Sequence, residues 1–268
     1  MAFMRISLYT ILILSVLASC QSGFEQVRLS NNPPLILKES IQYYDKGDYL
    51  RAQTLMELIL NQYRGTREGE ELFFKYAYTH YKLGNYALAA TYFTNFSTTF
   101  AYSPYTEESD FMIAYSYYKQ SPSFRLDQTP SVDAINAFQD FANKFPESDR
   151  VQECNELIDE LRSKLELKAY NEGLLYFNLS QYNAAITSFD NMLSEYPESV
   201  HAEHARFLIL QSAYDYAINS VYLKRAQRLE EAQTRYKDYI NRYPSGDNAR
   251  AARDLHKQIE SEIKNLSK

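Results

Sequence analysis

Apolar residues recur along most of the chain at the spacing of one face of an α-helix. In five segments an alanine is followed four and seven residues later by bulky apolar or aromatic residues, as in Ala134, Phe138 and Phe141. Residues at these offsets share a helix face, so each segment predicts an amphipathic helix whose alanine lets a neighbouring helix approach closely. The alanines of this pattern are Ala52, Ala89, Ala134, Ala185 and Ala232.

A turn signal and an earlier helical segment precede three of these helices. Gly47, Gly84 and Ser180 stand where the earlier helix is expected to end. Pro146, Pro197 and Pro244, each after an aromatic residue, follow three of the second helices, and proline cannot continue a helix. This arrangement resembles the tetratricopeptide repeat, in which two helices pack as a pair.

The repeats predict an all-α fold, a right-handed solenoid of about five tetratricopeptide helix pairs with a C-terminal capping helix from about Asp247 to Leu266. One pair cannot bury its apolar stripe alone, and stacking against neighbouring pairs covers it. We expect this domain to span residues 33–268, with N-terminal repeats at 33–149 and C-terminal repeats at 150–268. A loop at 120–130 and a helical stretch at 150–168 lengthen the spacing between repeats.

The segment before residue 33 differs from the repeats. Arg5 precedes an apolar run too short to span a bilayer comfortably, which predicts a signal peptide over residues 1–19. Leu17-Ala18-Ser19-Cys20 resembles a bacterial lipobox, so we expect Cys20 to be lipidated and residues 20–32 to form a tether. Gln21, where an aspartate would signal retention in the inner membrane, favours an outer-membrane, lipid-anchored protein on the periplasmic face. The alternative is an ordinary signal peptide with an incidental cysteine.

Composition narrows the fold and the partners. Glycine (7) and proline (8) are scarce, whereas tyrosine (25) and phenylalanine (15) are abundant, which favours helices over a β-sandwich or barrel. The net charge of −6 and the dispersed basic residues give no electrostatic footprint for nucleic acid. We therefore expect no nucleic-acid partner.

No group of side chains has the spacing of a catalytic site. His201 and His204 could contribute to a metal site, but no further ligands stand at a suitable spacing, and both fit a solvated helix start. The sequence also lacks a phosphate-binding glycine loop and a nucleophile elbow. We therefore expect neither a metal nor another cofactor, and no enzymatic activity. Cys154 is interpreted as a small buried residue.

Aromatic residues gather on the first helices of the expected pairs, which line the concave face of a tetratricopeptide solenoid. Tyrosine provides contact area there with little side-chain entropy to lose, so the pattern predicts a surface for an extended peptide. The same rings could equally form the core between helices. The peptide-binding candidates are Tyr44, Phe74, Tyr78, Tyr81, Tyr115 and Tyr118, and Phe111, Tyr170 and Phe177 fall on or near the same face.

The lipobox, the tether and the five repeats together resemble the BamD family of outer-membrane lipoproteins. Two further segments carry the resemblance, the loop with Gln120-Ser121-Pro122, Arg125 and Asp127-Gln128, and the stretch from Leu208 to Tyr222. The resemblance implies a scaffold subunit of the β-barrel assembly machinery, which folds and inserts outer-membrane β-barrel proteins.

The resemblance also implies partners for two regions. Residues 33–118 would receive unfolded outer-membrane protein substrates, and residues 202–244 would dock the POTRA domain of a BamA-like barrel protein. Candidates for BamA docking are Asn219, Lys224 and Arg228. Other assembly lipoproteins, and the membrane through the lipid anchor, complete the expected partners.

Two other functions compete with this interpretation. An envelope-coordination protein of the Tol–Pal type usually has an N-terminal coiled coil and no lipobox, and no heptad run precedes residue 33. A small SusD-like binding lipoprotein would carry a lobe rich in tryptophan for sugar stacking, and this chain has no tryptophan.

Overall fold

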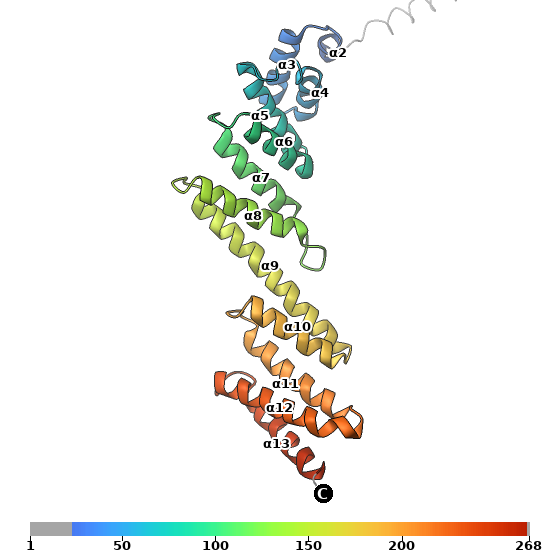
Figure 1. Ribbon diagram of the computed structural model, residues 1–268. Coiled ribbons are helices and arrows are strands. Elements are labelled where there is room, and N and C mark those ends of the chain that lie inside the picture. Colours follow the sequence, from blue (N-terminus) through green and yellow to red (C-terminus); the bar gives the residue numbers. More distant parts are fainter. Residues whose placement is uncertain (1–22, 267–268) are drawn as a thin grey trace, which may run out of the picture. The chain divides into compact units, whose positions relative to one another are not determined.

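The computed structural model describes residues 23–266, and these residues form twelve helices and no strand (Figure 1). Five helix pairs follow one another: α3 (Pro33–Asp45) and α4 (Tyr49–Ile59), α5 (Arg67–Lys82) and α6 (Tyr86–Thr99), α7 (Thr106–Gln120) and α8 (Thr129–Lys144), α9 (Val151–Asn178) and α10 (Tyr182–Glu195), α11 (Ala202–Ile218) and α12 (Tyr222–Arg242). The short helix α2 (Gly23–Arg28) precedes them and α13 (Ala249–Leu266) follows them. The structure thus confirms the predicted all-α fold of tetratricopeptide-type helix pairs.

The described chain divides into two compact units. The first holds the residues up to Pro122 together with 129–158, and the second holds residues 123–128 together with those from Asp159 onward. We expected the repeats to divide at residue 150, whereas the units divide within α9. Within each unit, consecutive helices pack against each other, as the solenoid pattern requires.

Local signals place the helix ends of the first unit. The side chain of Asn32 caps α3 by accepting a hydrogen bond from the Leu35 amide at 3.2 Å, and Thr66 caps α5 through the Gly69 amide at 3.0 Å. Gly47 and Gly84 follow the first helices with φ angles of 78° and 79°, which only glycine adopts without strain. The expected turns are therefore present.

The predicted seams of alanine and bulky residues form the core of the first unit. Ala52, Ala89 and Ala134 are completely buried, which lets the second helix of each pair lie close to its neighbours. Their bulky partners are buried as well, namely Met56, Ile59, Phe93, Phe96, Phe138 and Phe141.

The second unit repeats this arrangement with one substitution in the turn. Ser180 takes a φ of 56° at the position that glycine holds in the first two pairs. Phe189 of α10 is completely buried against α9, where a Cβ atom at Gly173 would lie 2.4 Å from Cε1 of the ring. Gly173 therefore sets the close approach of α9 and α10.

A carboxylate from α11 holds the C-terminal helix in place. Glu203 accepts hydrogen bonds from the Tyr239 hydroxyl at 2.8 Å and from the Asn248 amide at 3.1 Å, immediately before α13 begins. An anion at a helix N-terminus is stabilised by the unpaired amides and by the helix dipole. The observed helix, Ala249–Leu266, lies where the capping helix was expected.

Part of the expected tether is helical. In α2, Phe24 and Val27 lie on one side and pack against the core of the first unit, and Phe24 meets Tyr43 edge-on with ring centroids 5.7 Å apart. This apolar contact orders a segment that its polar composition marked as a linker. The expected signal peptide over residues 1–19 and the lipidation site Cys20 lie outside the described residues.

Candidate protein-binding surfaces

The six peptide-binding candidates lie on the first helices of the three pairs in the first unit. Tyr44 belongs to α3, Phe74, Tyr78 and Tyr81 belong to α5, and Tyr115 and Tyr118 belong to α7. Five of them form a continuous chain of ring contacts, with centroid distances of 5.1 Å (Phe74–Tyr78), 6.4 Å (Tyr78–Tyr81), 6.2 Å (Tyr81–Tyr115) and 5.6 Å (Tyr115–Tyr118). We call these six residues the aromatic face.

Each residue of the aromatic face is half-buried, so it serves both the core and the surface. Tyr78 packs edge-on against the buried Phe93 at 5.1 Å, and Tyr118 packs against the buried Phe138 at 6.5 Å. Phe111 and Tyr170, which the sequence placed on or near this face, are instead buried among neighbouring helices. Helical periodicity could not separate these positions because both sets occupy first helices.

A partly buried polar link joins α5 and α7 beneath the aromatic face. The Tyr78 hydroxyl donates to Glu108, which also pairs with Arg150 at 2.5 Å. The Arg150 guanidinium lies 4.1 Å from the centroid of Phe111. Burial and the nearby carboxylate raise the pKa of Tyr78 well above its usual value, so the hydroxyl stays neutral and acts as a donor.

Tyr44 lies at the edge of this face with a cation beside it. The Lys75 amine is 5.0 Å from the ring centroid of Tyr44 and pairs with Asp45 and Glu71, each at 3.1 Å. Burial raises the pKa of Tyr44 to about 12, and the hydroxyl of Tyr44 is one of the groups that raise the pKa of Tyr78. The aromatic face is therefore uncharged at neutral pH.

Sequence reasoning missed two rings that extend the face. Tyr105 stacks on Phe74 with centroids 4.5 Å apart and an interplanar angle of 19°, and Tyr86 lies 5.4 Å from Tyr81. The signal for Tyr86 was its position directly after the Gly84 turn, whereas Tyr105 precedes α7 and has no periodic signal.

The three BamA-docking candidates lie around the turn between α11 and α12, but they face different surroundings. Asn219 and Lys224 are exposed, although the Asn219 amide also donates to the Asp215 carbonyl at 2.8 Å. Arg228 turns inward, where its guanidinium lies 3.6 Å from the ring centroid of Tyr216 and donates to the Tyr216 hydroxyl at 2.7 Å and to Ser220. Arg228 therefore holds the turn in place and offers little surface to a partner.

Three consecutive apolar residues are exposed at this turn. Val221, Tyr222 and Leu223 expose 67%, 70% and 91% of their surface, beside the exposed Lys224. Arg225 fixes the same turn from the inside by donating to the Ile218 carbonyl at 2.9 Å. We call residues 221–224 the α12 patch. Sequence reasoning noted Val221 only as part of the resemblance, because an apolar run at a helix start is equally typical of a buried one.

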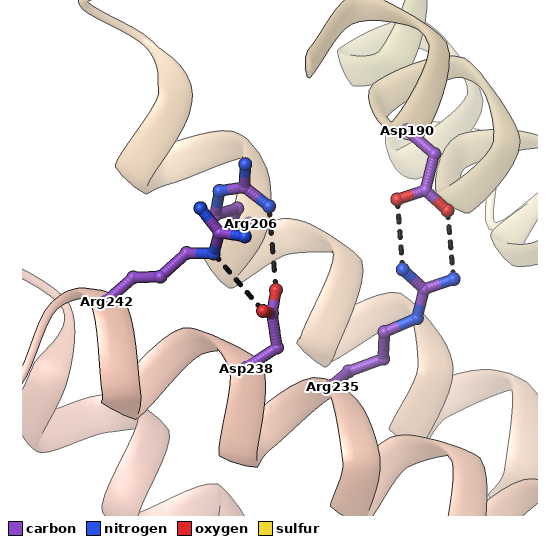
Figure 2. Close-up of polar contacts among 5 residues, drawn as sticks. All are labelled: Asp190, Arg206, Arg235, Asp238 and Arg242. Atoms are coloured by element: carbon purple, nitrogen blue, oxygen red, sulfur yellow. Dashed lines mark hydrogen bonds and ion pairs between the residues drawn. The ribbon is translucent and has the colours of Figure 1, made fainter. Parts of the chain in front are cut away.

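An ion-pair network ties together the helices that carry the α12 patch. Figure 2 shows Arg235 of α12 bound through both terminal nitrogens to Asp190 of α10, each at 2.9 Å. Asp238 pairs with Arg242 at 3.2 Å and with Arg206 of α11 at 3.5 Å (Figure 2). The bidentate pair adds geometric specificity to the packing of α10 against α12.

The histidines and the cysteine have structural partners. His201 stacks on Tyr170 with centroids 4.2 Å apart, and the Tyr170 hydroxyl lies 2.5 Å from Nδ1 of His204. Over residues 23–266, no group of three or more His, Cys, Asp or Glu side chains could hold a metal ion. Cys154 is buried, and burial raises the pKa of its thiol to about 11. None of the helices in the described part of the chain is long and apolar enough to cross a bilayer.

Several solved structures are similar to this chain, all at low identity. The yeast Sti1 TPR2AB-domain:pHSP90 complex is 13% identical, with 88% of this chain and 98% of that chain covered and a TM-score of 0.38. TTC0263, a thermophilic TPR protein from Thermus thermophilus, is 20% identical, with 85% and 97% covered and a TM-score of 0.33. No curated protein sequence matches the chain.

One family matches more than half of the chain. The sequence model of YfiO, described as an outer membrane lipoprotein, matches residues 31–216, which include α3 to α10 and most of α11. The match covers the aromatic face and the loop between α7 and α8. The chain therefore belongs to the YfiO family of outer membrane lipoproteins, which is the BamD family that its sequence resembles.

Proposed function

We propose that this protein is a non-catalytic scaffold subunit of the β-barrel assembly machinery. In this role it receives unfolded outer-membrane proteins on one unit and docks a BamA-like barrel protein on the other. The observation that carries the proposal is the aromatic face, a chain of half-buried tyrosines in a member of an outer membrane lipoprotein family. Such a face suits polypeptide binding better than catalysis.

The aromatic face suits an extended, apolar polypeptide. Its rings are held from below by the core, so little side-chain entropy is lost when a peptide covers them. Their hydroxyls remain neutral donors that can bond to peptide carbonyls without selecting for charge. We assign unfolded outer-membrane protein segments to this face, which includes Tyr44, Tyr78 and Tyr81.

The α12 patch suits a folded partner. Exposed apolar residues on a turn that two arginines hold in place form a small rigid contact, and Lys224 adds a cation at its edge. We assign the POTRA domain of a BamA-like protein to this patch together with Asn219. Arg228 supports the patch from within.

We place the protein at the periplasmic face of the outer membrane, anchored by acyl chains on Cys20, where other assembly lipoproteins can join it. Family membership supports the outer membrane. Cys20 itself lies outside the described residues.

Affinity isolation from detergent-solubilised envelopes tests the proposal. A tagged chain should recover a POTRA-containing barrel protein, and Leu223→Asp should abolish that recovery, because a charge cannot be buried without a partner. Tyr102→Asp provides the matched control, since Tyr102 is a fully exposed aromatic residue in the other unit. Recovery of Tol–Pal components in place of the barrel protein would overturn the proposal.

A further inference from the structure

The loop between α7 and α8 folds onto α9 and leaves a groove that none of the proposed roles uses. Residues 123–128 of this loop belong to the second compact unit, as does α9 from Asp159 onward. The residues that line the groove are Phe124, Arg125, Lys168, Asn171, Glu172 and Leu175.

Three hydrogen bonds hold the loop wall of the groove. Gln128 is more than nine-tenths buried and donates through Nε2 to the carbonyls of Ser123 at 2.9 Å and Leu126 at 3.1 Å. The Lys168 amine reaches across from α9 and donates to the same Leu126 carbonyl at 2.8 Å. The loop is therefore built as a fixed wall, although its sequence is that of a turn.

Apolar side chains stand exposed along this groove. Leu126 of the loop and Leu175 and Leu179 at the end of α9 expose 59%, 56% and 60% of their surface. Lys168, Leu175 and Leu179 are seven and four residues apart, which places them on one face of the helical path. Apolar residues that gather on one surface mark an interaction site more often than single exposed ones do.

The charges of the groove favour an anionic ligand. Arg125 lies 4.9 Å from the centroid of Phe124 and forms no ion pair with any residue in the described range. Lys168 is the second cation and Glu172 is the acid among the lining residues, so the lining carries an excess of one positive charge. The Asn171 amide nitrogen donates to the Leu167 carbonyl at 2.7 Å, which leaves its oxygen to accept a bond from a ligand.

We propose that this groove binds an internal, extended segment of a partner protein in which an apolar residue lies beside an acidic one. The apolar side chain packs between Phe124 and Leu175, and the acidic side chain pairs with Arg125 and Lys168. Asn171 and Glu172 accept main-chain N–H groups. The apolar surface continues beyond the cations to Leu179, so a bound chain runs past the acidic residue, which favours an internal segment over a chain end.

Peptide binding to the soluble chain from Gln21 onward tests the proposal. The probe is a fluorescein-labelled, amidated peptide set, Gly-Ser-Gly-X-Asp-Leu-Gly-Ser with X as Leu, Ile or Phe, and the measurement is fluorescence anisotropy. At least one member should bind saturably, and replacing its Asp by Asn should weaken binding about ten-fold, as should Arg125→Gln, because each removes a charge-assisted pair. Arg250→Gln, at an exposed arginine of α13 outside the groove, should leave binding unchanged.

Leu175→Asp, confirmed as folded by circular dichroism, should also weaken binding. Leu223→Asp, which tests the docking of a barrel protein, should bind the peptide normally, so this inference stands or falls apart from the proposed function. The inference is overturned if no peptide of the set binds, if the Asn peptide or Arg125→Gln binds as tightly as its parent, or if binding requires a free C-terminal carboxylate.

Discussion

Replacing Gly173 by alanine should destabilise the second unit, against the usual trend for glycine in a helix. An alanine in a helix interior is ordinarily more stable than glycine by roughly 1 kcal/mol. Here the added Cβ would lie 2.4, 2.5 and 2.8 Å from three atoms of the Phe189 ring. Carbon atoms at such distances overlap, so either the ring or the helix must move.

The magnitude depends on how far Phe189 can yield. The ring is completely buried and lies near Tyr170, with centroids 6.0 Å apart, so it has no free space to enter. Overpacking a core costs about 1–3 kcal/mol. We take the upper half of this range because three ring atoms clash. Subtracting the helix gain leaves a net loss of about 1–2 kcal/mol, equivalent to several degrees in Tm for a unit of this size.

Chemical denaturation of the soluble chain, followed by circular dichroism, measures the change. Gly23→Ala is the control, because nothing lies within 4 Å of a Cβ at that glycine. The double variant Gly173→Ala/Phe189→Leu should lose about 1 kcal/mol less than the sum of the two single losses, since the smaller side chain relieves the clash. A Gly173→Ala variant as stable as the parent, or more stable, would refute the reasoning.

Four further predictions concern side chains in other places. Unfolding free energy should fall as pH drops below about 6.5 and His80→Phe should flatten that dependence in urea titrations, because burial lowers the His80 pKa and the unfolded chain takes up its proton first. Arg228→Lys should destabilise the turn before α12 by about 1–2 kcal/mol in thermal melts, since an amine cannot both cover a ring and reach two oxygens. Cys20→Ala should shift the protein from the membrane to the soluble fraction upon fractionation; continued membrane association would contradict lipidation. The Cys154 thiol should resist alkylation until the chain unfolds, because burial raises its pKa to about 11.

The helix pairs could be predicted from the sequence because their signals are local. An alanine followed by bulky residues at fixed offsets specifies which face is buried, and Ala52 and Phe93 are buried as expected. The short helix α2 was missed because six residues carry too little periodicity to distinguish a helix from a linker. Its order comes from the contact between Phe24 and Tyr43.

The candidate surfaces were harder to predict because exposure depends on tertiary packing. Tyr115 and Tyr170 both lie on first helices, yet the structure leaves one half-buried and buries the other. Arg228 carries a charge that usually faces water, and only Tyr216 and Ser220 show why it turns inward. The groove of Arg125 requires the tip of a loop between α7 and α8 to pack on the later part of α9, and no sequence period reports such a contact.

The stapled turn between α11 and α12 affects how long a complex on that surface survives. Because Arg225 and Arg228 already fix its backbone, a partner that covers Val221 to Leu223 has few loop motions left to freeze. The conformational cost of association is then small, and a contact of modest area can reach a slow dissociation rate. Loosening either arginine should therefore shorten the lifetime of the complex even though neither side chain touches the partner.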